Sequence, residues 1–192
     1  MKKLLFFSAL LWTFSGWTQQ WAKQYEYVND FNCGLAQVSK DGKKGFVNKE
    51  GKLLIPLIYD DALRFEEGLA AVSKDGLWGY LDSTGKEVVP LQYKEAMTFS
   101  QGLARVEKGD HYGFIDRTGK VVISISFENA SSFSEGFAAV KKNGKWGFIN
   151  ISGDEVISPK YSYAVAFSGG TARVMKNGKW YIVDHNGKEV EE

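Results

Sequence analysis

The residues of this chain best suited to bind another molecule are four large aromatic side chains that recur at a constant spacing. They are Trp78, Tyr112, Trp146 and Trp180. Aromatic rungs at regular spacing can stack on sugar rings or hold a cationic group. The same rings can instead pack between neighbouring repeats, because aromatic side chains dominate packing energetics. The sequence favours the packing interpretation, and the exposure of the rings decides between the two.

Side chains for acid–base or metal chemistry are scarce. The two histidines, His111 and His185, fall in or beside predicted turns, where we expect both to be exposed. One repeat position carries an acid or its amide in every copy, and its residues are Asn48, Asp82, Asp116, Asn150 and Asp184. Paired carboxylates can hydrolyse glycosidic bonds. Asparagine in two of the five copies instead favours a short side chain that caps the turn after it.

The sequence also lacks the motifs of common enzyme classes. It contains no P-loop, GxSxG, HExxH or CxxC. Its single cysteine, Cys33, provides neither an internal disulfide nor a cysteine-based metal site. We therefore expect no enzyme activity, no catalytic residue, no metal site and no cofactor.

The charge of the chain is nearly balanced. Its 24 basic and 23 acidic residues give a net charge of +1, which does not suggest nucleic acid or an anionic membrane as a partner. Lysine recurs at one position of the repeat, as Lys40, Lys74, Lys108, Lys142 and Lys176. We interpret these lysines as a solubilising edge. Binding of an anionic glycan is the alternative.

The elements that position these residues form five tandem repeats with no insertion, so that equivalent residue numbers differ by 34. Phenylalanine keeps the spacing at Phe31, Phe65, Phe99, Phe133 and Phe167, and glycine keeps it at Gly34, Gly68, Gly102, Gly136 and Gly170. The units are residues 25–58, 59–92, 93–126, 127–160 and 161–192. Because such a period indicates a repeat architecture, we expect residues 19–192 to form one repeat domain.

Each unit contains the sequence signature of a β-hairpin. In the fourth unit, apolar runs flank Asn143 and Gly144, and this pair favours a tight turn because both of its residues adopt positive φ. We predict hairpins over residues 34–40 and 43–48 and over the four equivalent pairs of segments. A weaker third strand follows, and the stretch 59–65 is predicted to be an irregular or one-turn connector that buries its Tyr, Ala and Phe.

The turn fixes which side chains share a face of the hairpin. The glycine face of the fourth unit is Ala138, Val140, Gly147 and Ile149, and its aromatic face is Ala139, Lys141, Trp146 and Phe148. Because both faces are largely apolar, neighbouring units must cover both of them. We therefore predict an all-β array of β-hairpin or three-stranded repeats, stacked as an open superhelix. A closed five-bladed propeller is the alternative.

The end units predict the direction of stacking. The first unit has Lys44 where others carry an aromatic residue, so the aromatic face is expected to look toward the preceding unit. The last unit has Tyr181 in place of glycine, so the glycine face is expected to lie under the following unit. Trp146 is then predicted to pack over Gly113, with Trp78 over Gly45, Tyr112 over Gly79 and Trp180 over Gly147.

The tract Trp146, Gly147, Phe148, preceded by Asn-Gly and followed by Gly153, resembles the bacterial WG-repeat (KWG-repeat) family. Residues 78–81 and 112–115 fit the same pattern, whereas the first and last units depart from it. The resemblance covers residues 25–192. It implies an all-β repeat protein, often exported, with no general biochemical activity attached.

The N-terminus is typical of a secretory signal peptide over residues 1–18. Lys2 and Lys3 precede the apolar stretch 4–14, and cleavage is expected near Thr18, with an uncleaved N-terminal anchor as the alternative. We expect an extracytoplasmic protein, in the periplasm, on the cell surface or secreted, with no membrane attachment after cleavage. The expected function is a scaffold or interaction module for a protein or a cell-envelope polymer. The alternative is a carbohydrate- or small-ligand-binding module that uses the four aromatic rungs.

Overall fold

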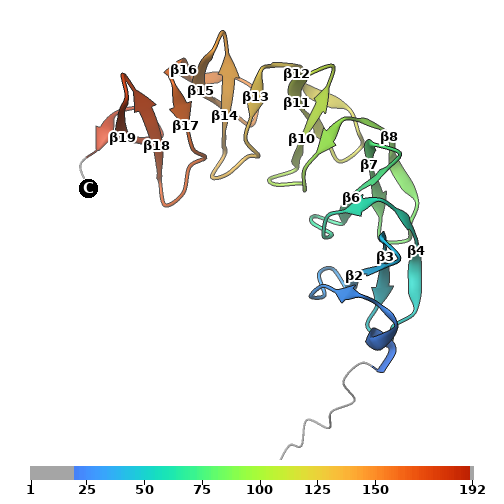
Figure 1. Ribbon diagram of the computed structural model, residues 1–192. Helices are drawn as coiled ribbons and strands as arrows, with labels where there is room; N and C mark the ends of the chain where they lie inside the picture. The colour runs from blue at the N-terminus through green and yellow to red at the C-terminus, as the bar shows by residue number, and fades with distance from the viewer. Residues whose placement is uncertain (1–19, 191–192) are drawn as a thin grey trace, which may run out of the picture.

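A computed structural model describes residues 20–190, and these residues form five four-stranded antiparallel sheets (Figure 1). A short 3-10 helix, η1 (Gln20–Gln24), precedes them. The first sheet contains β1 (Tyr27–Val28), β2 (Leu35–Lys40), β3 (Lys43–Asn48) and β4 (Leu53–Tyr59). The second contains β5 (Asp61–Ala62), β6 (Leu69–Lys74), β7 (Leu77–Asp82) and β8 (Glu87–Tyr93). The predicted signal peptide lies outside the described residues.

The remaining three sheets repeat this pattern. The third contains β9 (Glu95–Ala96), β10 (Leu103–Lys108), β11 (His111–Asp116) and β12 (Val121–Phe127). The fourth contains β13 (Asn129–Ala130), β14 (Phe137–Lys142), β15 (Lys145–Asn150) and β16 (Glu155–Tyr161). The fifth contains β17 (Tyr163–Ala164), β18 (Thr171–Lys176), β19 (Lys179–Asp184) and β20 (Glu189–Val190).

The predicted hairpins and their register are confirmed. In the fourth sheet Lys142 pairs with Lys145 and Val140 pairs with Gly147, and the other sheets repeat this register. Asn143 and Gly144 have φ values of 51° and 71°, as the predicted turn requires.

The connector prediction was wrong in one respect. The expected irregular stretch contains a two-residue strand, such as β5, which pairs with the next hairpin as the first strand of its sheet. The predicted burial is confirmed for Ala62 and Phe65, whereas Tyr59 is only partly buried.

The last strand of each of the first four sheets arches over a glycine. In the fourth sheet, β16 pairs with β15 at Tyr161 and Ile157, and the register shifts between these two pairs. A Cβ atom built on Gly147 would lie 2.3 Å from the carbonyl oxygen of Ile157. Glycine stands at this position because the backbone of its own sheet approaches closely, as strand glycines often allow.

The predicted direction of stacking was wrong. On the aromatic face of the fourth unit, Ala139 and Phe148 pack with Phe167 and Val174 of the fifth unit. The glycine face of the fourth unit instead packs against Phe114 and Ile123 of the third unit. The aromatic face therefore looks toward the following unit, so Trp146 does not pack over Gly113.

Neither end-unit substitution marks a free face. Lys44 forms an ion pair with Asp61 of the second unit, so it faces a neighbour and does not mark a free face. Tyr181 packs on the apolar cluster between the fourth and fifth units, so it also faces a neighbour.

The N-terminal segment covers the glycine face of the first unit. Trp21 and Tyr25 pack on Ala36, Val38 and Val47. The five apolar clusters of the described chain thus lie between consecutive units or under this segment. In Figure 1 the sheets follow an arc whose first and fifth members lie at opposite ends.

Replacing one of these glycines tests the arching strand. A Cβ atom on Gly113 would lie 2.6 Å from the Cα atom of Ile125. We expect Gly113→Ala to lower the free energy of unfolding by about 1–3 kcal/mol, because the β12 backbone must shift. Urea denaturation measures this change. Tyr181→Gly is the control, with a much smaller expected change, and an equal effect of both variants would contradict the explanation.

Candidate binding surface

The inner side of the arc carries five tight turns, one at the entrance to each second strand (Figure 1). Each turn has two central residues with positive φ. The first of them is Cys33, Glu67, Gln101, Glu135 or Gly169. A left-handed conformation costs a residue other than glycine about 1–2 kcal/mol. Long glutamate and glutamine side chains at this position therefore need a compensating interaction.

That interaction is a hydrogen bond to the next turn. The Gly102 backbone N–H donates to the Glu67 carboxylate at 3.0 Å, and the Gly136 N–H donates to the Gln101 side-chain oxygen at 2.8 Å. The N–H groups of Gly169 and Gly170 donate to the Glu135 carboxylate at 2.7 and 2.9 Å. These bonds form a ladder along the turns of units two to five. Sequence reasoning missed it, although a long polar residue directly before the repeated glycine was a usable signal.

Further polar contacts cross the junctions between units. The hydroxyl of Ser100 donates to the carbonyl of Phe133, and that of Ser134 donates to the carbonyl of Phe167. Arg105, whose side chain is 11% exposed, donates to the carbonyl of Ala130 at 2.7 Å. The inner turns are therefore held by neighbouring units, so the polar groups on this side have fixed positions.

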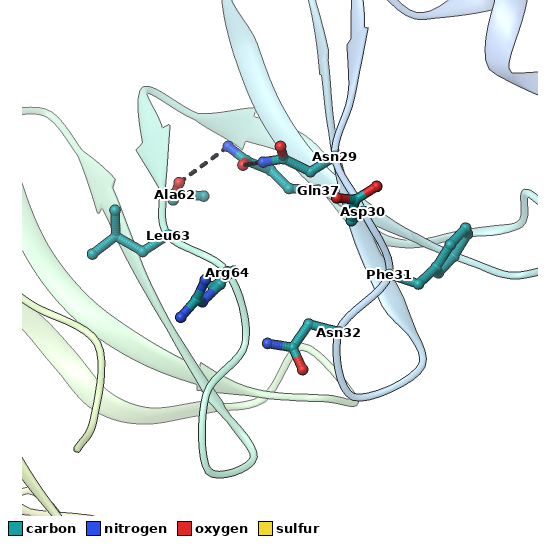
Figure 2. A pocket seen from close by; sticks show the side chains of 8 residues that line it. All are labelled: Asn29, Asp30, Phe31, Asn32, Gln37, Ala62, Leu63 and Arg64. Carbon is teal, nitrogen blue, oxygen red and sulfur yellow. Dashed lines mark hydrogen bonds between the residues drawn. The ribbon is translucent and has the colours of Figure 1, made fainter.

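A hollow of about 470 Å³ lies between the first two units. Its lining residues are Asn29, Asp30, Phe31, Asn32, Gln37, Ala62, Leu63 and Arg64. Figure 2 shows the buried Gln37 side chain donating to the Ala62 carbonyl, at 3.0 Å, and Asn29 donates to the Gln37 oxygen at 2.5 Å. The polar groups at its base are thus already paired with each other. None of the four predicted aromatic residues lines it.

The four predicted aromatic residues lie at equivalent places on successive units, and they do not come together in one site. Trp78, Tyr112 and Trp146 are half-buried at the junctions, and Trp180 is 44% exposed on the fifth unit. Trp146 lies 6.0 Å from Tyr163 of the next unit, measured between ring centroids. The Tyr112 hydroxyl donates to Glu107 at 3.1 Å. Half-burial against a neighbouring unit agrees with the packing interpretation for three of the four rings.

The Asp/Asn series caps turns, as predicted. Asp82 Oδ1 accepts hydrogen bonds from the backbone N–H groups of Thr84 and Lys86, at 2.9 and 3.0 Å. The hydroxyl of Thr84 also donates to it, and this bond is the main cause that lowers the pKa of Asp82 below its usual value. Asp116 and Asp184 accept equivalent backbone bonds. These carboxylates therefore serve the turns that follow them.

The two histidines differ from each other. His111 is exposed, with its Nδ1 atom 2.9 Å from the Gly109 carbonyl oxygen. His185 was expected to be exposed but is partly buried. Its ring stacks on Phe137 at 4.7 Å, and its Nε2 atom lies 3.5 Å from a Glu135 carboxylate oxygen, beyond good hydrogen-bond geometry. Between residues 20 and 190, no three His, Cys, Asp or Glu residues are grouped to hold a metal ion.

An exposed apolar position recurs at the second residue of the last strand of every sheet. We call these residues the exposed apolar series: Leu54, Val88, Val122, Val156 and Val190. Four of them are 36–42% exposed, and Val88 is partly buried. The preceding residue of the repeat varies between an apolar side chain and glutamate. An apolar side chain is thus kept at this position in all five units, and it is exposed to solvent in four of them.

Lowering the pH should weaken the hydrogen bonds of the ladder that a carboxylate accepts, and it should leave the bond that the Gln101 amide oxygen accepts unchanged. Backbone hydrogen bonds, first from Gly170 and then from Gly169, hold the pKa of Glu135 below its ordinary value. A depressed folded-state pKa means that this stabilisation is full above the unfolded pKa and is lost as the pH falls through the folded one. We expect Glu135→Ala to lower the urea midpoint at pH 7 and to change it much less at pH 3.

The matched control is Gln101→Ala. It removes the equivalent bond to Gly136 without removing a titrating group. Its cost should therefore be the same at both pH values. A cost of Glu135→Ala that does not depend on pH would show that the carboxylate does not act through its charge.

Comparison with solved structures reveals propeller-like relatives of the fold. Hsv2p of Kluyveromyces lactis is 13% identical with a TM-score of 0.55, and the alignment covers 85% of this chain and 62% of that one. A eukaryotic initiation factor is 13% identical with a TM-score of 0.52, covering 85% and 53%. PorZ, a surface component of the type-IX secretion system of Porphyromonas gingivalis, is 10% identical with a TM-score of 0.50, covering 87% and 28%. The chain thus spans about three fifths of the length of Hsv2p.

The sequence comparisons identify the repeat. None of the curated proteins is similar enough in sequence to match the chain. No helix among residues 20–190 has the length and apolar character needed to cross a bilayer. The model of the WG containing repeat matches residues 22–43, 45–78, 78–110, 112–146 and 146–180, and these five matches include strands of all five sheets. The chain therefore belongs to the WG containing repeat family.

Proposed function

We propose that this chain is an exported, non-catalytic scaffold that presents an open arc of repeated surfaces to a protein or cell-envelope partner. The observation that carries the proposal is the exposed apolar series. Single exposed apolar residues are common and need no explanation, whereas a regular set of them is typical of an interaction surface. Five such positions at one repeat spacing suit a long partner that makes the same contact several times.

Two further observations support binding over catalysis. The recurrent carboxylates are already occupied by the amides of their own turns, so they are poorly placed to exchange protons with a substrate. The inner turns are tied to one another, which gives the arc the rigidity of a scaffold. A sugar-binding role for the aromatic rungs has less support, because three of the four rings are half-buried between units.

Two substitutions in the exposed apolar series test the proposal. We expect Val122→Lys together with Val156→Lys to reduce capture of a partner from the envelope fraction of the native cells by at least about tenfold, as expected when two central apolar contacts are lost. Quantitative mass spectrometry of cross-linked complexes measures the capture. Both side chains are about two fifths exposed, at 42% and 40%, so the fold should remain stable.

The matched control is Leu77→Lys. Leu77 is 43% exposed and lies outside the series, at a repeat position where Lys43 and Lys145 already stand. This variant should capture the same partner as the unmodified chain. Equal loss in both variants, or no loss in either, would show that the exposed apolar series is not the binding surface.

Export has a separate test. If the proposal is right, the protein recovered from outside the cytoplasm should begin near Gln19, because the signal peptide is removed on export. Mass determination of the intact protein measures its first residue. A chain that stays in the cytoplasm with its N-terminus intact would contradict this part of the proposal.

A further inference from the structure

The aromatic face of the fifth unit is the one aromatic face of the described chain that no following unit covers. Trp180 is 44% exposed and Tyr163 is 49% exposed. Ile182 is partly exposed, whereas its counterpart Phe148 is fully buried under the fifth unit. Arg173 lies exposed over the Trp180 ring, 5.0 Å from its centroid, just as Arg105 lies over Tyr112.

The opposite end of the array is covered by a piece of the same repeat. Trp21 stands one full period before Ile55 of β4, so it occupies the repeat position of a residue in the last strand of a sheet. The structure places it accordingly. A Cβ atom on Gly51 would meet the Trp21 ring, and one on Gly85 would meet the Ile55 side chain at 3.3 Å. Residues 21–25 thus cover the first unit much as the last strand of each sheet covers the unit after it.

The two ends fit together in the register of the repeat. Val190 is a repeat equivalent of Leu54, and Trp21 is a repeat equivalent of the next residue, Ile55. The last strand of the fifth sheet is described as far as Val190, and Trp21 carries the repeat position that follows that of Val190. That position is buried and apolar in the other units, as Ile55, Val89, Ile123 and Ile157. In the sequence, Val190 is instead followed by the charged Glu191.

We propose that the aromatic face of the fifth unit binds the N-terminal segment and first unit of a second copy of this chain. Residues 21–25 of the second copy, which include most of the 3-10 helix η1, rearrange to extend along β19 and continue the last strand that β20 begins. Tyr25 then lies beside Trp180, as Tyr161 lies beside Trp146. Arg173 donates to the Val28 carbonyl, the repeat equivalent of the Ala130 carbonyl that accepts from Arg105.

A second copy fits this face better than the chain's own N-terminus does. Figure 1 shows the first and fifth sheets at opposite ends of the arc, with η1 already seated on the first sheet. The proposed junction between two copies would have no ladder bond, because Gly169 has no side chain to accept one. The junction between the first two units, at Cys33, also has no ladder bond, so such a bond is not required for two units to pack. The resulting contact joins different faces of two identical chains, so it generates a ring or a filament.

Self-association of the purified chain is the first test. We expect sedimentation velocity to show a mass that rises with protein concentration. Trp180→Lys should weaken this association by at least about tenfold, since it places a charge at the centre of the contact. Leu77→Lys, on a side chain of nearly the same exposure, should leave the association unchanged. A concentration-independent monomer, or equal weakening by both variants, would overturn the proposal.

Disulfide trapping determines which segments meet. Two single-cysteine chains are prepared in a Cys33→Ser background, one with Tyr25→Cys and the other with Trp180→Cys. Mixed and oxidised, they should form a heterodimer in preference to either homodimer, because Tyr25 of one copy lies beside Trp180 of the other. Carrying both cysteines on one chain should yield a series of covalent oligomers. A cross-linked monomer from that chain would show closure within one molecule and would refute assembly between copies.

Discussion

A single aromatic pair recurs at every junction between units, and the rest of the array depends on it. Phe46 packs on Phe65 with ring centroids 4.9 Å apart, and the equivalent pairs are Tyr80 with Phe99, Phe114 with Phe133, and Phe148 with Phe167, at 4.7–4.9 Å. In each pair one ring comes from a hairpin and the other from the segment that enters the next hairpin. Because a hairpin with two apolar faces is unstable alone, this contact makes each unit depend on its neighbours.

Hydrogen bonds between the inner turns add to the contact that the aromatic pairs make between neighbouring units. The Glu67, Gln101 and Glu135 turns hold strained backbone conformations, and each is compensated by the next turn along the arc. The strained backbone of each turn is thus coupled to the packing of the next unit, because the side chain of the strained residue finds its hydrogen-bond donor only when that unit is in place. The last unit has Gly169 at this position, where a positive φ carries no such cost.

Much of the hairpin geometry could be predicted because it is local. A two-residue turn with positive φ at Asn143 and Gly144 fixes the pairing of every residue that follows. The direction of stacking could not be predicted in the same way, because it depends on which unit supplies the partner of Lys44, and Asp61 belongs to the next unit. The short strands such as β5 were missed because two residues are too few to show a period. The packing role of Trp78, Tyr112 and Trp146 agrees with their half-burial, whereas the exposed apolar series only became visible once exposure was known.

The cap that Trp21 forms on the first unit gives the array a direction. One end is closed by a ring that fills the space above Gly51, and the other end presents Trp180 to water. In a linear array, each unit is stabilised mainly by its nearest neighbours. The fifth unit, held from one side only, is therefore the weakest in the isolated chain and opens first. Fraying should proceed from the C-terminal end toward the middle, so that hydrogen exchange protection rises along the chain from β19 back to β7.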